Sequence, residues 1–335
     1  MTLPQVLERS AGTVAPALRS AADRLSPAMR AVIGYHLGWL DAEGNPADRS
    51  GGKTVRATLA LLSAQAAAGS AGDGMPGAVA VELVHTFSLL HDDIMDDDAE
   101  RHHRPAAWAV FGRARAILAG DAVLALAFRE LLSAESAHRV AAVEALADAT
   151  GRLIDGQAAD LDLEGRMDAT PQECTDMCAG KTGALLECSA SIGALLAGAG
   201  DDVVAPLRAF GAHLGLAFQA VDDLLGIWGD PALTGKPVHG DLAQRKTSLP
   251  VAIALASSAS EAGGLRDLLA RPHLDAAGLA AAAGLVEACG GRDGAVVRAR
   301  EQLALALGAL ESAPIAAGPR AEMAAVARFV AARDF

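Results

Sequence analysis

The chain has few aromatic residues: they make up 3% of its 335 residues, with a single tyrosine. Aromatic and β-branched residues favour strands, whereas alanine, which is abundant throughout this sequence, favours helices. No segment shows the sustained alternation of apolar and polar residues that marks a half-buried strand, and apolar residues recur at helical spacing almost everywhere. The sequence therefore predicts an all-α protein.

Cysteine is also scarce, and no long apolar run is present. The four cysteines are Cys174, Cys178, Cys188 and Cys289. No further Cys or His completes a zinc site near them, so we expect small buried thiols in a reducing compartment. The N-terminal segment has no basic start followed by an apolar run, and no stretch of about 18 apolar residues lacks charge. We expect a cytoplasmic protein without a transmembrane segment.

Basic residues are fewer than acidic ones, 28 Lys and Arg against 41 Asp and Glu, which gives a formal net charge of -13. A nucleic-acid surface needs clustered Lys and Arg, so nucleic acid is excluded as a partner. An anionic substrate would have to be met by local cations or metal ions, since the global field repels it.

Helical periodicity divides the chain into thirteen segments. They are 4–25, 27–42, 51–69, 76–97, 105–134, 137–165, 171–198, 202–228, 243–258, 262–271, 274–290, 293–311 and 317–333. The breaks between them are short clusters of turn residues, and none is long enough for a flexible interdomain linker. We therefore expect one domain, residues 1–335, built as a large antiparallel helical bundle.

Acidic residues cluster in HDDIMDDDAERHHRPA at 91–106, at the end of an apolar helical segment. Asp92 and Asp96 lie one helical turn apart, so their carboxylates share a face and repel each other unless a cation lies between them. Carboxylate oxygens without His or Cys suit a hard ion such as Mg²⁺. Upstream, His85 and Ser88 extend the polar stripe along the apolar helix, which argues against the alternative of a merely solvated acidic helix end.

A second acidic pair lies in AFQAVDDLLGIWGD at 217–230, where Gln219, Asp222 and Asp223 share one face of a strongly apolar helix. Burying two adjacent carboxylates among apolar side chains is costly unless they are paired or bound to metal. One such pair is weak evidence, but two aspartate-rich helix ends in one helical protein are much stronger. We expect them to face each other across a cavity and to hold divalent ions between them.

Basic residues flank or follow the two acidic segments at Arg101, Arg104, Lys236, Arg245 and Lys246. Lys53 and Arg56 follow a Gly-Gly pair at a helix start, and Lys181 interrupts an apolar helix. Each of them alone is more often a surface charge. Together with the acids they suit a diphosphate, because Mg²⁺ neutralises some of its oxygens while Lys and Arg bind the rest.

In these segments the sequence resembles the trans-isoprenyl diphosphate synthases, over about positions 45–255. The matching motifs are GGKTVR at 51–56, HDDIMDDDAER at 91–101, GKTGALLE at 180–187, FQAVDDLLG at 218–226 and GKPVHGDLAQRKTSLP at 235–250. Their order and spacing agree with the family. The resemblance implies the isoprenoid synthase fold, a helical bundle around a deep central cavity, a homodimer, and isoprenoid diphosphates as substrates.

The resemblance also implies roles for particular residues. Asp92 and Asp96 would bridge two of three Mg²⁺ ions and Asp222 would hold the third, with Asp93 and Asp223 acting around them. The residues expected to bind the allylic diphosphate are Arg101, Lys181, Lys236 and Lys246. Those expected to bind isopentenyl diphosphate are Lys53, Arg56, His85 and His102. Thr182 and Gln219 would lie near the developing allylic cation.

Product length is expected to depend on Phe87 and Ser88, which precede Asp92 by five and four residues. In the family, an aromatic residue at the deeper position alone is associated with a twenty-carbon product. The resemblance therefore implies geranylgeranyl diphosphate as the main product. Farnesyl diphosphate is the alternative.

The chain departs from the family pattern at His102, where a second arginine is usual, and at Gly226, where the second motif usually has a third aspartate. Thr54 and Ala57 also differ from the usual residues. Because neutral imidazole binds diphosphate less well than Arg, His102 and Thr54 favour an alternative, a terpene cyclase that acts on an allylic diphosphate alone. A noncatalytic partner subunit of a prenyl synthase is a third reading, which the intact aspartates oppose.

Overall fold

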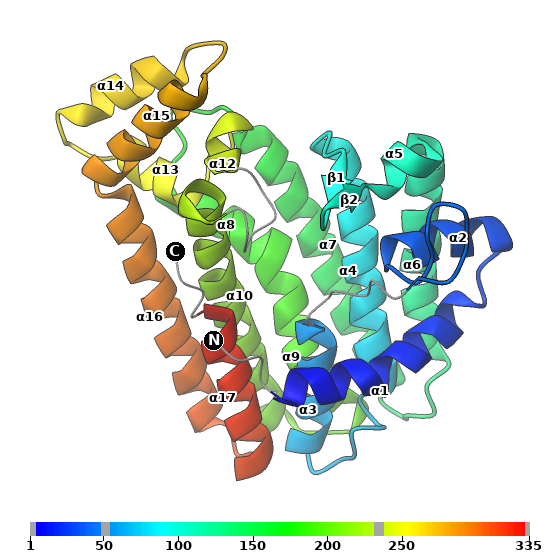
Figure 1. Ribbon diagram of the computed structural model, residues 1–335. Coiled ribbons are helices and arrows are strands. Elements are labelled where there is room, and N and C mark those ends of the chain that lie inside the picture. Colours follow the sequence, from blue (N-terminus) through cyan, green and yellow to red (C-terminus); the bar gives the residue numbers. More distant parts are fainter. Residues whose placement is uncertain (1–4, 48–53, 231–237, 332–335) are drawn as a thin grey trace.

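The computed structural model describes residues 5–47, 54–230 and 238–331, and its helices run largely side by side (Figure 1). The helices are α1 Gln5–Ala22, α2 Pro27–His36, α3 Val55–Ala66, α4 Met75–Met95, α5 Ala107–Phe111, α6 Arg113–Leu132, α7 Arg139–Leu163, α8 Pro171–Cys178, the π-helix η1 Ala179–Gly183, α9 Ala184–Leu196, α10 Asp201–Trp228, α12 Gly240–Ala243, α13 Leu249–Leu255, α14 Glu261–Leu269, α15 Ala276–Ala288, α16 Gly291–Ser312 and α17 Ala317–Ala331. Within the described residues the strands are β1 Glu100–Arg101 and β2 Arg104–Pro105. The predicted all-α class is confirmed.

Helix starts follow ordinary capping chemistry. Ser26 precedes α2, its side chain accepts from the backbone N–H of Met29, and Pro27 occupies the first helical position. α8 begins with a capping box in which Thr170 and Glu173 each accept from the other's backbone N–H. These caps satisfy backbone donors that would otherwise lack partners.

The core lies between long helices that pack on one another. α4 packs on α6, α9 packs on α3, α7 and α10, and α10 packs on α16. In Figure 1, α14 and α15 lie together at one end, beyond α13. α4 supplies an almost continuous apolar surface to the largest hydrophobic cluster. Its C-terminal end, which carries the first acidic segment, is thereby held in a fixed place.

The sequence-based boundaries are wrong in three places. The predicted helix 27–42 ends at His36, the last residue of α2. The predicted helix 105–134 is broken at Gly112, whose φ of +85° cannot continue a helix, so α5 and α6 are separate. Of the predicted helix 243–258, only Leu249–Leu255 is helical as α13, and α12 ends where the prediction begins, at Ala243. Residues 51–53, at the start of another predicted helix, lie outside the described residues.

The expectations for the cysteines and for membrane-spanning helices can be compared with the described part of the chain. All four cysteines are free and buried, as predicted. Among the described helices, none is long and apolar enough to cross a membrane.

α3 and α9 lie in close contact. A Cβ added at Gly193 would overlap the carbonyl oxygen of Ala60, and the Gly193 backbone N–H donates to Ser63 Oγ over 3.0 Å. Glycine at this position therefore allows the two backbones to approach each other.

We predict that Gly193→Ala destabilises the protein by about 1–3 kcal/mol, because the added methyl group forces α3 and α9 apart. The matched control is Gly284→Ala on exposed α15, where no atom lies within 4 Å of the added Cβ. The control should be neutral or stabilising by up to about 1 kcal/mol. Denaturant unfolding measures both, and equal stabilities for the two variants would contradict the assignment.

Candidate active site

The first acidic segment lies at the C-terminal end of α4. Asp92 and Asp93 occupy the last turn, and Asp96 is the C-cap residue, whose backbone N–H donates to the carbonyl of Asp92. The side chain of Asp93 is 1% exposed, and those of Asp92 and Asp96 are partly buried. The predicted group of carboxylates at one helix end is therefore present.

Two bases bind this segment, Arg101 from just beyond it in the chain and Lys246 from a distant part. Arg101 Nε donates to Asp93 Oδ1 over 2.7 Å, and Lys246 Nζ donates to Asp96 Oδ2 over 2.7 Å. Burial raises the pKa of Asp93, although the Arg101 guanidinium opposes this. Burial alone would lower the pKa of Lys246, but the Asp96 carboxylate outweighs it, so the pKa is raised and the ammonium is retained. The four predicted residues thus meet as two ion pairs.

A third base, Lys181, approaches from η1. Its Nζ lies 3.2 Å from Asp92 Oδ1 and donates to Asp160 Oδ2 on α7 over 2.6 Å. Burial would lower the pKa of Lys181, but Asp92 and Asp160 together raise it. The sequence analysis did not single out Asp160, because α7 carries several acids and no motif distinguishes this one.

Lys181 lies in a π-helical turn, a feature that is frequent at functional sites. Its position depends on a glycine contact: a Cβ at Gly156 on α7 would overlap the backbone nitrogen of Lys181. The backbone of η1 therefore rests directly on α7, and the Lys181 side chain reaches both α7 and α4.

The second acidic segment is part of a hydrogen-bond network near the end of α10. Asp223, which is 6% exposed, accepts from Gln219 Nε2 and from the backbone N–H of Leu249, each over 2.9 Å. Thr182 Oγ1 donates to Gln219 Oε1 over 2.7 Å. Burial raises the pKa of Asp223 to about 7, against both bonds that it accepts. Asp222, one residue earlier on the same helix, is partly buried.

Another carboxylate that the sequence analysis missed belongs to this group. Asp241 on α12 is 8% exposed, and its negative charge contributes to the raised pKa of Asp223. A Cβ added at Gly226 would overlap the Asp241 carboxylate. The sequence feature that could have indicated Asp241 was Gly226. A side chain at position 226 would occupy the place of the Asp241 carboxylate.

A short hairpin holds Arg101 and His102. The turn residues His102 and His103 have φ values of +52° and +60°, the left-handed conformation that a two-residue turn of this kind requires and that glycine adopts most easily. Arg104 Nη2 donates to the carbonyls of Tyr35 and His36, over 2.9 and 3.0 Å, at the end of α2. Arg104 therefore ties the hairpin to α2 rather than facing the acidic segment that it flanks in sequence.

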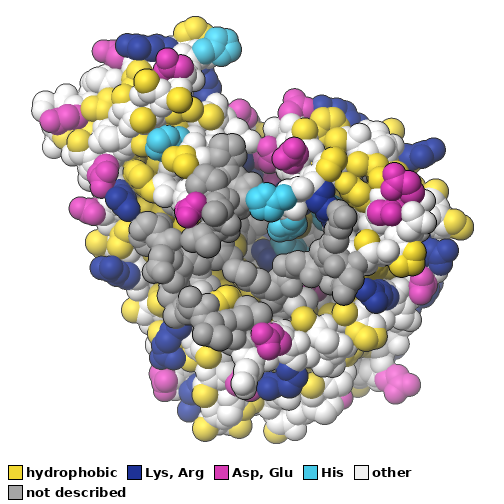
Figure 2. Space-filling model, viewed as in Figure 1, with side chains coloured by type: hydrophobic (Ala, Val, Ile, Leu, Met, Phe, Trp, Pro, Cys, Tyr) yellow, Lys and Arg dark blue, Asp and Glu magenta, His cyan; other side chains and the backbone are white. Residues whose placement is uncertain are grey.

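A basic pocket lies beside the hairpin. His85 on α4 is close to Arg56, Arg101, His36 and His102; burial, and then these neighbours, lower its pKa well below the ordinary value. In Figure 2, histidine and Lys or Arg side chains gather at the edge of the hollow in this face. The structure thus brings together three residues expected to bind isopentenyl diphosphate, and it adds His36, for which the sequence held no signal.

Phe87 and Ser88 lie on the same helix, below the aspartates. Phe87 is 7% exposed and packs edge-to-face on His91, with 4.8 Å between ring centroids. Ser88 is partly buried, and its hydroxyl donates to the carbonyl one turn back over 2.8 Å. Lys53 and Lys236, which were also predicted to bind diphosphate, lie outside the described residues.

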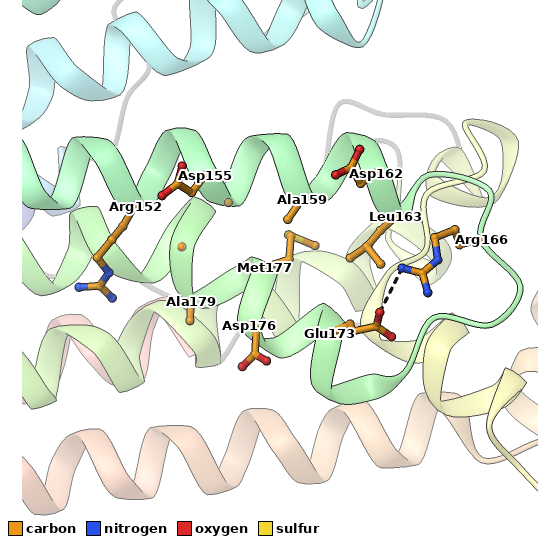
Figure 3. A pocket seen from close by; sticks show the side chains of 12 residues that line it. Arg152, Asp155, Ala159, Asp162, Leu163, Arg166, Glu173, Asp176, Met177 and Ala179 are labelled. Atoms are coloured by element: carbon orange, nitrogen blue, oxygen red, sulfur yellow. Dashed lines mark hydrogen bonds and ion pairs between the residues drawn. The ribbon is translucent and has the colours of Figure 1, made fainter.

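A separate cleft of about 540 Å³ lies between α7 and α8 (Figure 3). Its charged lining residues are Arg152, Asp155, Asp162, Arg166, Glu173 and Asp176. Arg152 is bound to Glu187 over 2.8 Å and Arg166 to Glu173 over 3.0 Å. Because acids outnumber bases and both guanidiniums are paired, this cleft does not suit a diphosphate.

Comparison with known proteins agrees with this geometry. The family model described as Polyprenyl synthetase matches residues 39–285. The (2E,6E)-farnesyl diphosphate synthase of Mycobacterium tuberculosis is 47% identical over 337 residues, covering 99% of this chain and 94% of that protein. The geranylgeranyl diphosphate synthase of the same organism is 44% identical over 310 residues, covering 92% and 89%. The crystal structure of a polyprenyl synthetase from Streptomyces coelicolor A3(2) superposes with a TM-score of 0.94 at 47% identity, covering 98% of this chain and 99% of that one.

Proposed function

The chain belongs to the polyprenyl synthetase family and is a trans-isoprenyl diphosphate synthase, and we propose that it condenses isopentenyl diphosphate with an allylic diphosphate to give mainly geranylgeranyl diphosphate. The observation that carries this proposal is the set of ion pairs that joins the aspartates of α4 to Lys181, Lys246 and Arg101 beside a basic pocket. We further propose that residues 1–335 form a single isoprenoid synthase domain.

The acidic side chains have the donor chemistry of divalent-metal ligands, although no three carboxylate, His or Cys side chains of the described residues converge on one point. Asp92 Oδ1 and Asp93 Oδ2 are buried and accept no hydrogen bond within the described residues, although Lys181 lies 3.2 Å from the former. Oxygen ligands of this kind suit Mg²⁺. In the proposal, Asp92 and Asp96 would hold two ions and Asp222 a third. When bound, the metal would neutralise diphosphate charge and stabilise it as a leaving group.

The bases of the site would bind that leaving group. Lys181, Lys246 and Arg101 are all charged in the substrate-free protein and are all paired with carboxylates. Metal held by Asp92 and Asp96 would release Lys246 and one of the two partners of Lys181, and these bases, with Arg101, would bind the oxygens of the allylic diphosphate. The allylic C–O bond then breaks, and the diphosphate departs with the electron pair without any protein nucleophile.

The remaining steps use the second substrate and the apolar cavity. The hydroxyl of Thr182 and the amide of Gln219, held together by their hydrogen bond, lie on the side of η1 and α10 where the allylic cation would form. The alkene of isopentenyl diphosphate attacks that cation, forming the new C–C bond. A proton is then lost to the released diphosphate, which leaves a new double bond. In the proposal, apolar side chains around the substrates would exclude water from the cation.

We predict that Asp92→Asn or Asp96→Asn lowers turnover at least about 100-fold with the fold intact, because metal stabilisation of transition-state charge is worth several kcal/mol. Turnover at saturating Mg²⁺, together with the thermal midpoint, gives the measurement. Asp97→Asn is the matched control in the same acidic segment, since Asp97 is exposed and pairs with Arg113 on the surface. Near-normal turnover of either site variant would contradict the assignment of Asp92 and Asp96 as metal ligands.

The assignment of product length rests on Phe87. Five residues along a helix correspond to about 7.5 Å, so its ring lies below the aspartates at which the diphosphate would be anchored. The ring is buried in the largest hydrophobic cluster, and the next residue towards the aspartates, Ser88, is small and partly buried. A chain that grows down the cavity would therefore stop at Phe87.

We predict that Phe87→Ala shifts the products to twenty-five carbons or longer, because the substitution removes the floor of the cavity. Chromatography of the dephosphorylated products measures the shift. The control is Phe210→Ala, which removes an equally large ring from the separate cluster between α3, α10 and α17 and should leave product length unchanged. If the products of the Phe87 variant are no longer than those of the wild type, residues deeper in the cavity set the limit.

The terpene cyclase alternative is tested by supplying the substrates separately. With Mg²⁺, labelled isopentenyl diphosphate and farnesyl diphosphate, a synthase makes a longer diphosphate. A cyclase makes a hydrocarbon from farnesyl diphosphate alone. The convergence of Arg56 and His85 on one pocket favours the synthase, since a cyclase has no second diphosphate to bind.

A homodimer is supported by apolar side chains left exposed on α6 and α7. They recur every seven residues, at Leu118, Ala125 and Leu132 on α6 and at Val140, Ala147, Ile154 and Leu161 on α7. Seven-residue spacing is the pattern with which helices pack on other helices. Because α6 and α7 contact each other, the two stripes offer adjoining surfaces to a second copy of the chain.

We predict that Leu118→Glu combined with Ile154→Glu converts the dimer to a monomer, since each change buries a charge in the proposed interface. Light scattering after size-exclusion chromatography gives the mass. Leu305→Glu, at a similarly exposed leucine on α16, is the control and should leave the dimer intact. A wild-type chain that runs as a monomer would contradict the proposal.

A further inference from the structure

Three histidines from three elements converge in the basic pocket. His36 is the last residue of α2, His85 lies on α4, and His102 forms the exposed tip of the hairpin at the pocket edge. The position of His102 is fixed, because Arg104 binds the end of α2 through the carbonyl of His36. The three rings are close enough that His102 lowers the pKa of both other histidines.

Permanent cations surround these rings. The bases that face them are Arg56, Arg101, Arg104 and His103, and the acids next to those bases are Glu82 and Asp93. Burial, followed by Arg101 and Arg104, lowers the pKa of His36 to about 3. Burial and the neighbouring guanidiniums also lower the pKa values of His85 and His102. All three rings are therefore neutral at pH 7 while the pocket holds no anion.

The pocket also contains a donor without an acceptor. Arg56 Nε is buried and donates to no described residue, and the nearby Glu82 carboxylate already accepts from the backbone N–H of Ala57 over 3.0 Å. A buried donor in this condition is costly unless a ligand satisfies it. An anion in the pocket would satisfy Arg56 and would reverse the electrostatic balance at the histidines, since it attracts the protons that the guanidiniums repel.

We propose that isopentenyl diphosphate binds in this pocket with uptake of a proton, which is shared among His36, His85 and His102, and that His36 is a binding residue of the pocket. The proton comes from the solvent, so a neutral imidazole becomes an imidazolium beside the diphosphate. This proposal rests on the proposed function, because it takes isopentenyl diphosphate as the ligand. In the proposal, histidines that are neutral in the empty pocket supply the positive charge that an arginine would otherwise provide to the diphosphate.

The sign of the pH dependence follows from linkage. The histidine pKa is higher in the complex than in the empty pocket, so binding is strongest at low pH and weakens as pH rises through the raised value. Between pH 7 and 8.5 the diphosphate stays ionised, since the second phosphate pKa is about 6. In that range the dissociation constant should rise by up to about tenfold per pH unit for each proton taken up.

Calorimetry provides the direct test. Isopentenyl diphosphate is titrated into the protein at pH 7, without an allylic substrate, in two buffers that differ in ionisation enthalpy. The wild type should take up close to one proton per ligand, and His36→Asn and His102→Arg should each take up less. His273→Asn, at an exposed histidine between α14 and α15, is the control and should match the wild type.

Kinetics of the complete Mg²⁺-dependent reaction gives a second measurement. The KM for isopentenyl diphosphate should rise from pH 7 to 8.5 in the wild type and stay nearly flat in His102→Arg, while the KM for the allylic substrate follows one profile in both. Binding without proton uptake, or uptake unchanged in both variants, overturns the proposal and leaves the condensation reaction standing. Failure of isopentenyl diphosphate to bind or react overturns both.

Discussion

Repulsion between the carboxylates at the end of α4 is the constraint on which the site depends. Asp92 and Asp96 lie one turn apart beside the buried Asp93, an arrangement that is unfavourable without nearby positive charge. The protein provides it from η1, from the hairpin and from the segment after α12. These partly buried ion pairs also fix how distant helix ends lie around the site.

The ion pairs further explain how an acidic chain accommodates substrates with several negative charges. With a formal net charge of -13, the protein repels anions overall. The basic side chains of the site are positioned by ion pairs with carboxylates rather than by water. In the proposed reaction these side chains therefore need to move little when metal binds the carboxylates. Lys181 shows this best: Asp92 and Asp160 keep it charged despite its burial.

The sequence predicted the parts of the structure that depend on local pattern. Apolar periodicity identified most helices, and the carboxylates of both acidic segments could be placed because one helical turn determines their neighbours. Prediction from the sequence failed where contacts between distant parts of the chain determine the structure. The break at Gly112 depends on the φ angle that the packing requires, and Asp160 and His36 enter the site only through folding. None of the three belongs to a local motif, so no spacing rule could have identified them.

The two departures from the family pattern have opposite physical consequences. At Gly226 an acidic side chain is missing from α10, but the carboxylate of Asp241 lies against that glycine, so the negative charge near Asp223 is retained from another element. Beside His102 the described residues offer no such replacement, because His36 and His85 are themselves neutral and Arg101 and Arg104 already bind Asp93 and the end of α2. The metal side of the site thus keeps a carboxylate close to the position of the missing one, whereas the charge of the opposite pocket depends on its ligand.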